Sequence, residues 1–235
     1  MTSQLGRPLW GGTSWATPPT PGPHCELPGS GPLLEPIAAY TSAAFVLAAL
    51  AIVALAARAR GLDRTRVVFA VLVAGIGVGS FIQHGPNPAY ADLLHDLPLL
   101  GTLAFVAADS LAALVRRERV WWWWAAPTVA AVPLILAAPL AGDGAQVVVA
   151  AAAVVLTLAR ARRERPVRRR VGWAVGLLAV GSIIGTLSRG GWPLCDPESL
   201  WQGHAVWHVL AAAALVVLAP TLTSGEASTD EDDGR

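Results

Sequence analysis

The feature that most constrains this chain is a series of long apolar segments separated by short polar ones. Seven such segments can be marked, at 34–57, 67–84, 93–115, 120–140, 146–158, 171–187 and 200–222. A helix of about 20 mostly apolar residues spans the hydrocarbon core of a bilayer, because its backbone polar groups are satisfied within the helix. The sequence therefore predicts an all-α integral membrane protein whose domain 34–222 is a bundle of seven transmembrane helices.

The composition favours the same class of protein. Only 14% of the residues are charged and 54% are hydrophobic, whereas about a quarter of the residues of a soluble domain are charged. The formal net charge is +1, so the chain lacks the strongly basic character of a nucleic-acid-binding protein. We therefore expect a membrane lipid, and no nucleic acid, as the partner.

The basic residues are distributed on one side of the predicted bundle. All 17 are arginines, and 14 of them lie in the connections after the first, third and fifth segments, at 58–66, 116–119 and 159–170. The three opposite connections contain only Arg189. Because short arginine-rich loops stay in the cytoplasm, we expect the N-terminus outside and the C-terminus inside.

Two polar regions flank the predicted bundle. Residues 1–33 are rich in Pro, Gly, Ser and Thr and predict an irregular external segment, whereas 223–235 is an acidic tail that is expected to be disordered in the cytoplasm. The absence of lysine and the long alanine runs suggest a GC-rich bacterial gene. The expected location is therefore the bacterial inner membrane.

Histidines gather at one predicted membrane face. His84 ends the second segment, His95 begins the third, and His204 and His208 begin the seventh, while His24 belongs to the external segment. Residues four apart share a helix face, so His204 and His208 can bind one ion together. Three imidazoles with an open fourth position are the typical catalytic zinc arrangement. A single histidine in an apolar helix is more often a structural hydrogen-bonding group, but this convergence predicts a metal site.

A carboxylate near such a site could act as a general base. Asp96 is the candidate, and Asp92 lies one helical turn before it. Adjacent helical residues point about 100° apart, so His95 and Asp96 cannot serve the metal equally, and the sequence leaves the choice between them open.

The pattern resembles the alkaline ceramidases, within the wider superfamily of seven-helix membrane hydrolases that includes the adiponectin-receptor-like proteins. The resemblance is spread along the chain and rests on CE at 25–26 with Glu35, GSFIQH at 79–84, LP at 97–98, LCDP at 194–197 and QGHAVWH at 202–208.

The resemblance implies roles for individual residues. Three histidines would hold zinc: His84, His204 and His208. Ser80 would hydrogen-bond the metal-bound water or the developing oxyanion, and an aspartate of the third segment would act as general base. His95 stands where the family has its aspartate, with Asp96 one place later. Either Asp96 takes over the role, or His95 becomes a fourth ligand and closes the site.

The resemblance also implies a calcium site and a disulfide. Calcium usually takes six or more oxygen ligands, but only Glu26 and Glu35 remain here, and Pro23 and Pro28 stand where further ligands are expected. Two cysteines are present, Cys25 and Cys195, both on the predicted outer side. They either form the disulfide that the resemblance favours or remain as free thiols.

These observations predict a zinc-dependent intramembrane hydrolase that cleaves the amide bond of ceramide, or of a ceramide-like N-acyl lipid, and releases a fatty acid. Its catalytic residues would be Asp96 and Ser80. The alternative is a seven-helix receptor-like or lipid-binding protein with a structural metal, which a closed four-ligand site including His95 would favour.

Overall fold

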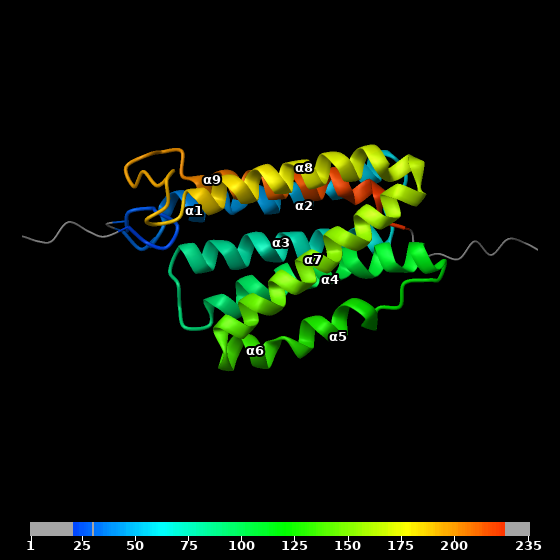
Figure 1. Ribbon diagram of the computed structural model, residues 1–235, viewed down its shortest axis with the longest axis horizontal. Coiled ribbons are helices and arrows are strands. Elements are labelled where there is room, and N and C mark those ends of the chain that lie inside the picture. The colour runs from blue at the N-terminus through cyan, green and yellow to red at the C-terminus, as the bar shows by residue number, and fades with distance from the viewer. Residues whose placement is uncertain (1–20, 30, 224–235) are drawn as a thin grey trace, which may run out of the picture.

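The computed structural model describes residues 21–29 and 31–223, and every regular element within them is helical (Figure 1). Residues 1–20 and 30 of the predicted external segment lie outside the described residues, as does the acidic tail from 224 onwards. The helices are α1 (Pro36–Thr41), α2 (Ala43–Arg58), α3 (Arg64–His84), α4 (Ala91–Val115), α5 (Trp122–Ala130), α6 (Val132–Ala137), α7 (Pro139–Arg163), α8 (Arg165–Leu187) and α9 (Gly203–Leu218), which continues into a 3-10 turn, Ala219–Thr221.

Six helical segments of the described chain are long and apolar enough to cross a membrane. They are Pro36–Arg58, Arg64–His84, Ala91–Val115, Leu140–Arg163, Arg165–Leu187 and Gly203–Thr221. Each of them overlaps a predicted span, and the first joins α1 to α2 through Ser42. The all-α prediction is therefore confirmed, and the chain has the architecture of a multi-pass membrane protein.

The predicted fourth span, 120–140, is two short helices. Pro133 lies in the first turn of α6, Ala138 leaves the helical conformation with ψ 74°, and Pro139 begins α7. Proline has no amide hydrogen and fits the first turn of a helix, so Pro133 and Pro139 lie where α6 and α7 begin. The 16 residues of Trp122–Ala137 rise about 24 Å as helix, less than the roughly 30 Å hydrocarbon core.

Glycines allow the closest helix packing. A Cβ at Gly79 of α3 would collide with the Leu94 carbonyl of α4, and one at Gly181 or Gly185 of α8 would press on Trp207 of α9. Small residues at such positions let helix backbones approach without intervening lipid. These contacts hold the end of α3 against the start of α4, and α8 against α9.

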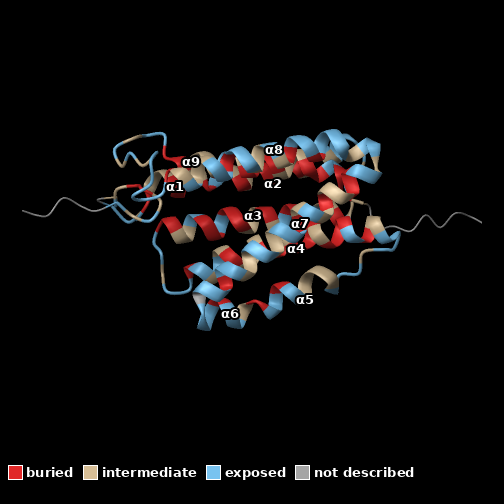
Figure 2. Ribbon diagram, in the orientation of Figure 1, coloured by how far each residue is buried: buried red, intermediate tan, exposed pale blue. Residues whose placement is uncertain are grey.

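Buried and exposed residues alternate along the helices of the bundle (Figure 2), and large apolar residues are found both in the core and among the exposed positions. Phe69 and Phe105 stack at a ring-centroid distance of 5.9 Å in that core. Leu47, Leu50 and Val71 are more than 60% exposed. Extensive apolar surface of this kind requires a partner other than water, and lipid is the partner that a membrane bundle has.

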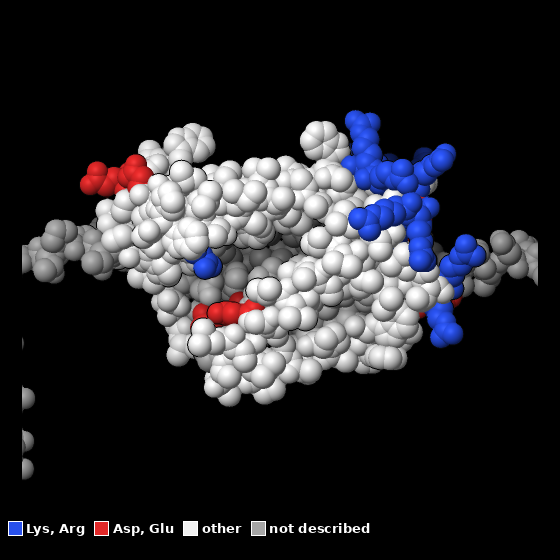
Figure 3. Space-filling model, viewed as in Figure 1, with Lys and Arg blue, Asp and Glu red and all other residues white. Residues whose placement is uncertain are grey.

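The two ends of the bundle differ in charge. The connections that follow α2, α4 and α7 lie at one end, and Figure 3 shows basic side chains gathered there. We call this the arginine end. The segment before α1 and the connection from α8 to α9 lie together at the opposite end (Figure 1), which we call the histidine end.

A buried network of ion pairs stabilises the arginine end. Asp109 of α4 is 1% exposed and accepts hydrogen bonds from Arg119 at 2.6 Å and from Arg160 of α7 at 3.0 Å. The Thr223 hydroxyl donates to the same carboxylate at 2.7 Å. Asp109 therefore joins α4, α7 and Thr223, which lies two residues after the last 3-10 turn; sequence reasoning missed this interaction.

Candidate metal centre

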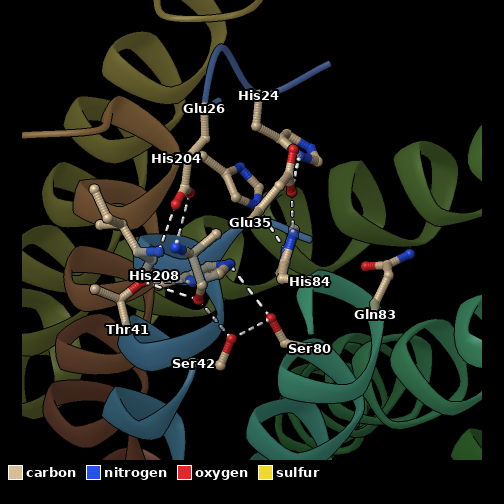
Figure 4. Close-up of polar contacts among 12 residues, drawn as sticks. His24, Glu26, Glu35, Thr41, Ser42, Ser80, Gln83, His84, His204 and His208 are labelled. Atoms are coloured by element: carbon tan, nitrogen blue, oxygen red, sulfur yellow. Dashed lines mark hydrogen bonds and ion pairs between the residues drawn. The ribbon is translucent and has the colours of Figure 1, made fainter. Parts of the chain in front are cut away.

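Three histidines converge at the histidine end from three different parts of the chain (Figure 4). His84 is the last residue of α3, His204 lies in the first turn of α9, and His24 belongs to the segment before α1. One nitrogen of each lies within 4.8 Å of a nitrogen of the other two. This group could hold a metal ion, and it includes two of the predicted ligands together with His24, which was not predicted.

The closest pair fits the dimensions of a zinc site. Nε2 of His84 and Nε2 of His204 are 3.2 Å apart. Two nitrogens that each lie about 2.05 Å from a tetrahedral zinc are separated by about 3.4 Å. The backbone therefore already places these two donors at nearly the spacing that zinc requires, and neutral imidazole is a ligand that zinc prefers.

Glu35 orients two of the three imidazoles. Its Oε2 accepts hydrogen bonds from Nδ1 of His84 at 2.6 Å and from Nδ1 of His24 at 2.9 Å. Both rings are then in the Nδ1–H tautomer, which leaves each Nε2 free to bind a metal. A carboxylate behind a ligating histidine is the usual outer-shell arrangement of zinc sites.

The Glu35 carboxylate is ionised at neutral pH. Burial by itself raises its pKa, but the hydrogen bonds and charges of His24 and His84 outweigh burial and lower the pKa to about 2. An ionised carboxylate makes stronger hydrogen bonds to N–H donors than a neutral acceptor does. Glu35 therefore holds both rings firmly.

His208 lies beside this group without joining it. Its ring centroid is 4.5 Å from that of His204 and 5.3 Å from that of His84. Its Nδ1 bonds to the Thr41 hydroxyl oxygen at 3.1 Å, and its Nε2 lies 3.4 Å from Oγ of Ser80. His208 therefore lies next to the three converging histidines, but its Nε2 faces the hydroxyl of Ser80.

Ser80 is completely buried, and its Oγ accepts a hydrogen bond of 2.8 Å from Ser42. Ser80 does not line the cavity that opens beside the three converging histidines. The structure thus brings Ser80 to His208, on the protein side of the cluster.

His24 is held in place by the disulfide. Cys25 and Cys195 are bonded, with their Cα atoms 5.5 Å apart, which confirms the predicted pairing and excludes free thiols. Pro23 O also accepts a hydrogen bond of 3.2 Å from Gly190 N. The imidazole of His24 stacks on that of His204 at a centroid distance of 3.9 Å.

A cavity of about 430 Å³ opens beside the histidines. His24, His84 and His204 line it, together with both residues between which the sequence could not choose, His95 and Asp96. Nδ1 of His95 donates to Oδ1 of Asp96 at 2.8 Å. Neither residue is in the group of converging ligand atoms, so the structure does not bring His95 to the position of a fourth ligand.

The remaining lining of the cavity is polar and charged, except for Ile135 and Trp207. It comprises Gln83, Asp92, Asp143, Gln146 and Arg189. Figure 3 shows acidic and basic groups flanking a hollow on this face. The site is therefore a polar chamber at one end of an apolar bundle, bordered by α6 and the start of α7.

The two glutamates that suggested calcium have other partners. Glu26 accepts hydrogen bonds from the amides of Ile37 and Ala38, and burial raises its pKa although these bonds oppose the shift. Glu35 accepts hydrogen bonds from His24 and His84. The described residues therefore do not offer calcium the oxygen-rich cage that it requires, and we assign it no part in the site.

No protein-family model matches the chain, and no curated protein matches it. The function is therefore inferred from the residues and their geometry.

Proposed function

We propose that this protein is a zinc-dependent membrane hydrolase that cleaves the amide bond of an N-acyl lipid of the ceramide type. The observation that carries the proposal is the pair of Nε2 atoms 3.2 Å apart, on His84 and His204, at the wall of a cavity that also contains Asp96. Metal-binding nitrogens, a carboxylate and a cavity that can admit substrate are the components of a metallohydrolase.

His84 and His204 would hold the metal. The third ligand would be either His24, which converges with them, or His208, which the ceramidase resemblance implies and whose Nε2 would then turn from Ser80 to the metal. When bound, zinc polarises the amide carbonyl and lowers the pKa of a water molecule. The water attacks the carbonyl carbon, the C–N bond breaks, and a fatty acid and an amine result.

Asp96 accepts the proton of the attacking water. Its Oδ1 is occupied by the hydrogen bond from His95, so Oδ2 is the atom that takes the proton and returns it to the leaving amine. His95 fixes the orientation of the carboxylate. Ser80 holds Nε2 of His208 at 3.4 Å and thereby positions that ring.

An amphiphilic substrate suits the position of the chamber. Its polar lining accommodates a head group with hydroxyl and amide groups, which hydrogen-bond to Asp92 and to Arg189. Leu136 and Leu140, at the end of α6 and the start of α7, are 61% and 87% exposed. These side chains offer an apolar approach for acyl chains from the bilayer next to the chamber wall formed by Ile135.

We further propose that the pair α5 and α6 is the fourth of seven crossings, which places the N-terminus outside and the C-terminus in the cytoplasm. The gathering of arginines at one end supports this orientation. The histidine end then faces the outer leaflet of a bacterial inner membrane.

Fatty-acid release from defined N-acyl lipids by the zinc-loaded protein in detergent tests the proposal. We expect release by the wild type, and a fall of about 10²–10⁴-fold in Asp96→Asn, because the general base is lost. His208→Ala should also reduce release, and Asp143→Asn, at the exposed rim of the same cavity, should not. Equal hydrolysis by the wild type, Asp96→Asn and His208→Ala would refute the catalytic function.

A second candidate is a lipid-binding or receptor-like protein with a structural metal. The presence of His24 beside the predicted ligands favours it, because four protein ligands leave zinc without an open position. Saturable binding of an N-acyl lipid with no release of fatty acid by the zinc-loaded wild type would select this candidate.

A further inference from the structure

We propose that His24 donates a nitrogen to the same metal ion as His84 and His204, and that the Cys25–Cys195 disulfide holds it there. The inference rests on the metal site of the proposed function but not on catalysis. It adds a ligand from the segment before the first membrane helix.

The first observation is that ligand nitrogens of three histidines converge. A nitrogen of His24 lies within 4.8 Å of the ligand atoms of both other histidines. Its ring centroid is 3.9 Å from that of His204 and 5.1 Å from that of His84. Neither of the two remaining histidines, His95 and His208, completes such a group among the described residues.

The shared carboxylate is the second observation. Glu35 bonds Nδ1 of His24 through both oxygens, at 2.9 and 3.1 Å, and also bonds Nδ1 of His84. The same group therefore sets the same tautomer in both rings. One outer-shell carboxylate orienting two ligands explains why both Nε2 atoms are left without a proton and available to a metal.

The clamped backbone around His24 is the third observation. Cys25, which is completely buried, has φ +70°, a left-handed conformation that a non-glycine residue adopts only when its surroundings impose it. The disulfide on one side and the Glu26 bonds to the amides at the start of α1 on the other impose it here. This local constraint directs the side chain of His24 towards the cluster.

The disulfide also explains why a ligand this remote in sequence can be used. Cys195 precedes His204 by nine residues, and Cys25 follows His24 directly. The covalent bond therefore joins the two segments that carry the stacked imidazoles. Without it, the segment before α1 would have to be ordered against α9 by weak contacts alone, at a large cost in conformational entropy.

Zinc affinity of the detergent-solubilised full chain, measured by competition with a chromogenic chelator, tests the proposal. His24→Phe retains an aromatic ring to stack on His204 but has no nitrogen. We expect its affinity to fall by more than the roughly 10–100-fold that loss of an outer-shell partner costs. His95→Ala, which removes another imidazole from the same cavity, should bind zinc as the wild type does.

The double variant Cys25→Ser/Cys195→Ser tests the tether without leaving a single thiol that could bind zinc. We expect its affinity to fall in the same direction, and adding His24→Phe to it to cause no further loss, because the two changes remove the same interaction. Far-ultraviolet circular dichroism of each variant verifies that the helices are retained.

The outcomes separate the inference from the proposed function. Zinc affinity of His24→Phe equal to that of the wild type overturns the inference, even if the wild type hydrolyses lipid. A weakened affinity, together with no fatty-acid release by the zinc-loaded wild type, supports the inference and refutes the hydrolase function.

Discussion

Replacing Glu35 by glutamine should weaken zinc binding, because this carboxylate orients two imidazoles at once. Oε2 of Glu35 accepts from Nδ1–H of both His24 and His84. A glutamine oxygen can accept only one of these hydrogens in good geometry, and its NH2 group opposes the other as a second donor. At least one ring therefore loses its outer-shell partner.

Loss of an outer-shell partner costs about 10–100-fold in metal affinity, or about 1.4–2.7 kcal/mol. Because Glu35 serves two rings, we expect Glu35→Gln to reach the upper part of that range. The assay is chelator competition for zinc, with the purified protein in detergent.

Glu26→Gln is the matched control for this experiment. Glu26 and Glu35 are 4% and 5% exposed and lie in the same segment, but Glu26 bonds only the amides of Ile37 and Ala38. We expect Glu26→Gln to bind zinc like the wild type. Equal affinities for Glu35→Gln and the wild type, or an equal loss in both variants, would refute the orienting role of Glu35.

Three further predictions concern stability in detergent. Asp109→Asn should lower the free energy of unfolding by about 3–5 kcal/mol, because Arg119 and Arg160 lose the buried carboxylate that they share, whereas Glu118→Gln at an exposed position nearby should not; equal unfolding of the two variants would argue against the ion network. Gly79→Ala should destabilise the bundle by about 1–3 kcal/mol, seen as a lower Tm, since its Cβ meets the Leu94 carbonyl; an unchanged Tm would show that α3 and α4 can separate freely. Zinc at 100 times its Kd should add about 2.7 kcal/mol to the stability of the wild type and much less to that of His84→Ala; equal gains would place the metal elsewhere.

Much of the fold could be predicted because membrane helices follow from length and apolarity. The six long segments of the structure correspond to predicted spans, and glycines such as Gly79 and Gly181 occupy close helix contacts. The segment 120–140 was different, because its hydropathy does not show where a proline removes the backbone amide hydrogen. Pro133 and Pro139 lie in the first turns of α6 and α7. These prolines indicated the helix boundaries, which a count of apolar residues does not show.

The candidate site was predictable where its geometry is local. The spacing of four between His204 and His208 placed them on one face of a helix, and the matched depth of His84 brought it to the same end. His24 lies outside every span, so neither periodicity nor depth could place it. The available signal was its neighbour Cys25, because pairing with Cys195 draws His24 towards the start of α9.

Asp109 was missed for a related reason. An isolated acid inside an apolar segment signals a buried partner, but the sequence does not reveal which of the many arginines lie within reach. Arg119 is ten residues away and Arg160 is on another helix, and only the packing of α4 against α7 selects that pair.

The two ends of the bundle are thus stabilised by different interactions, and this difference is relevant to the proposed function. At the arginine end, Asp109 joins three parts of the chain through hydrogen bonds from two arginines and a threonine. At the histidine end, the segment before α1, the end of α3 and the start of α9 meet through imidazoles that could hold an ion between them, with Glu35 behind two of the rings. The hydrogen bonds of Asp109 do not involve the proposed metal, so any ordering that zinc would provide is confined to the end with the polar cavity. The proposed hydrolase would require that division, because its chamber would have to admit and release an amphiphile while the helices that carry the ligands keep their places.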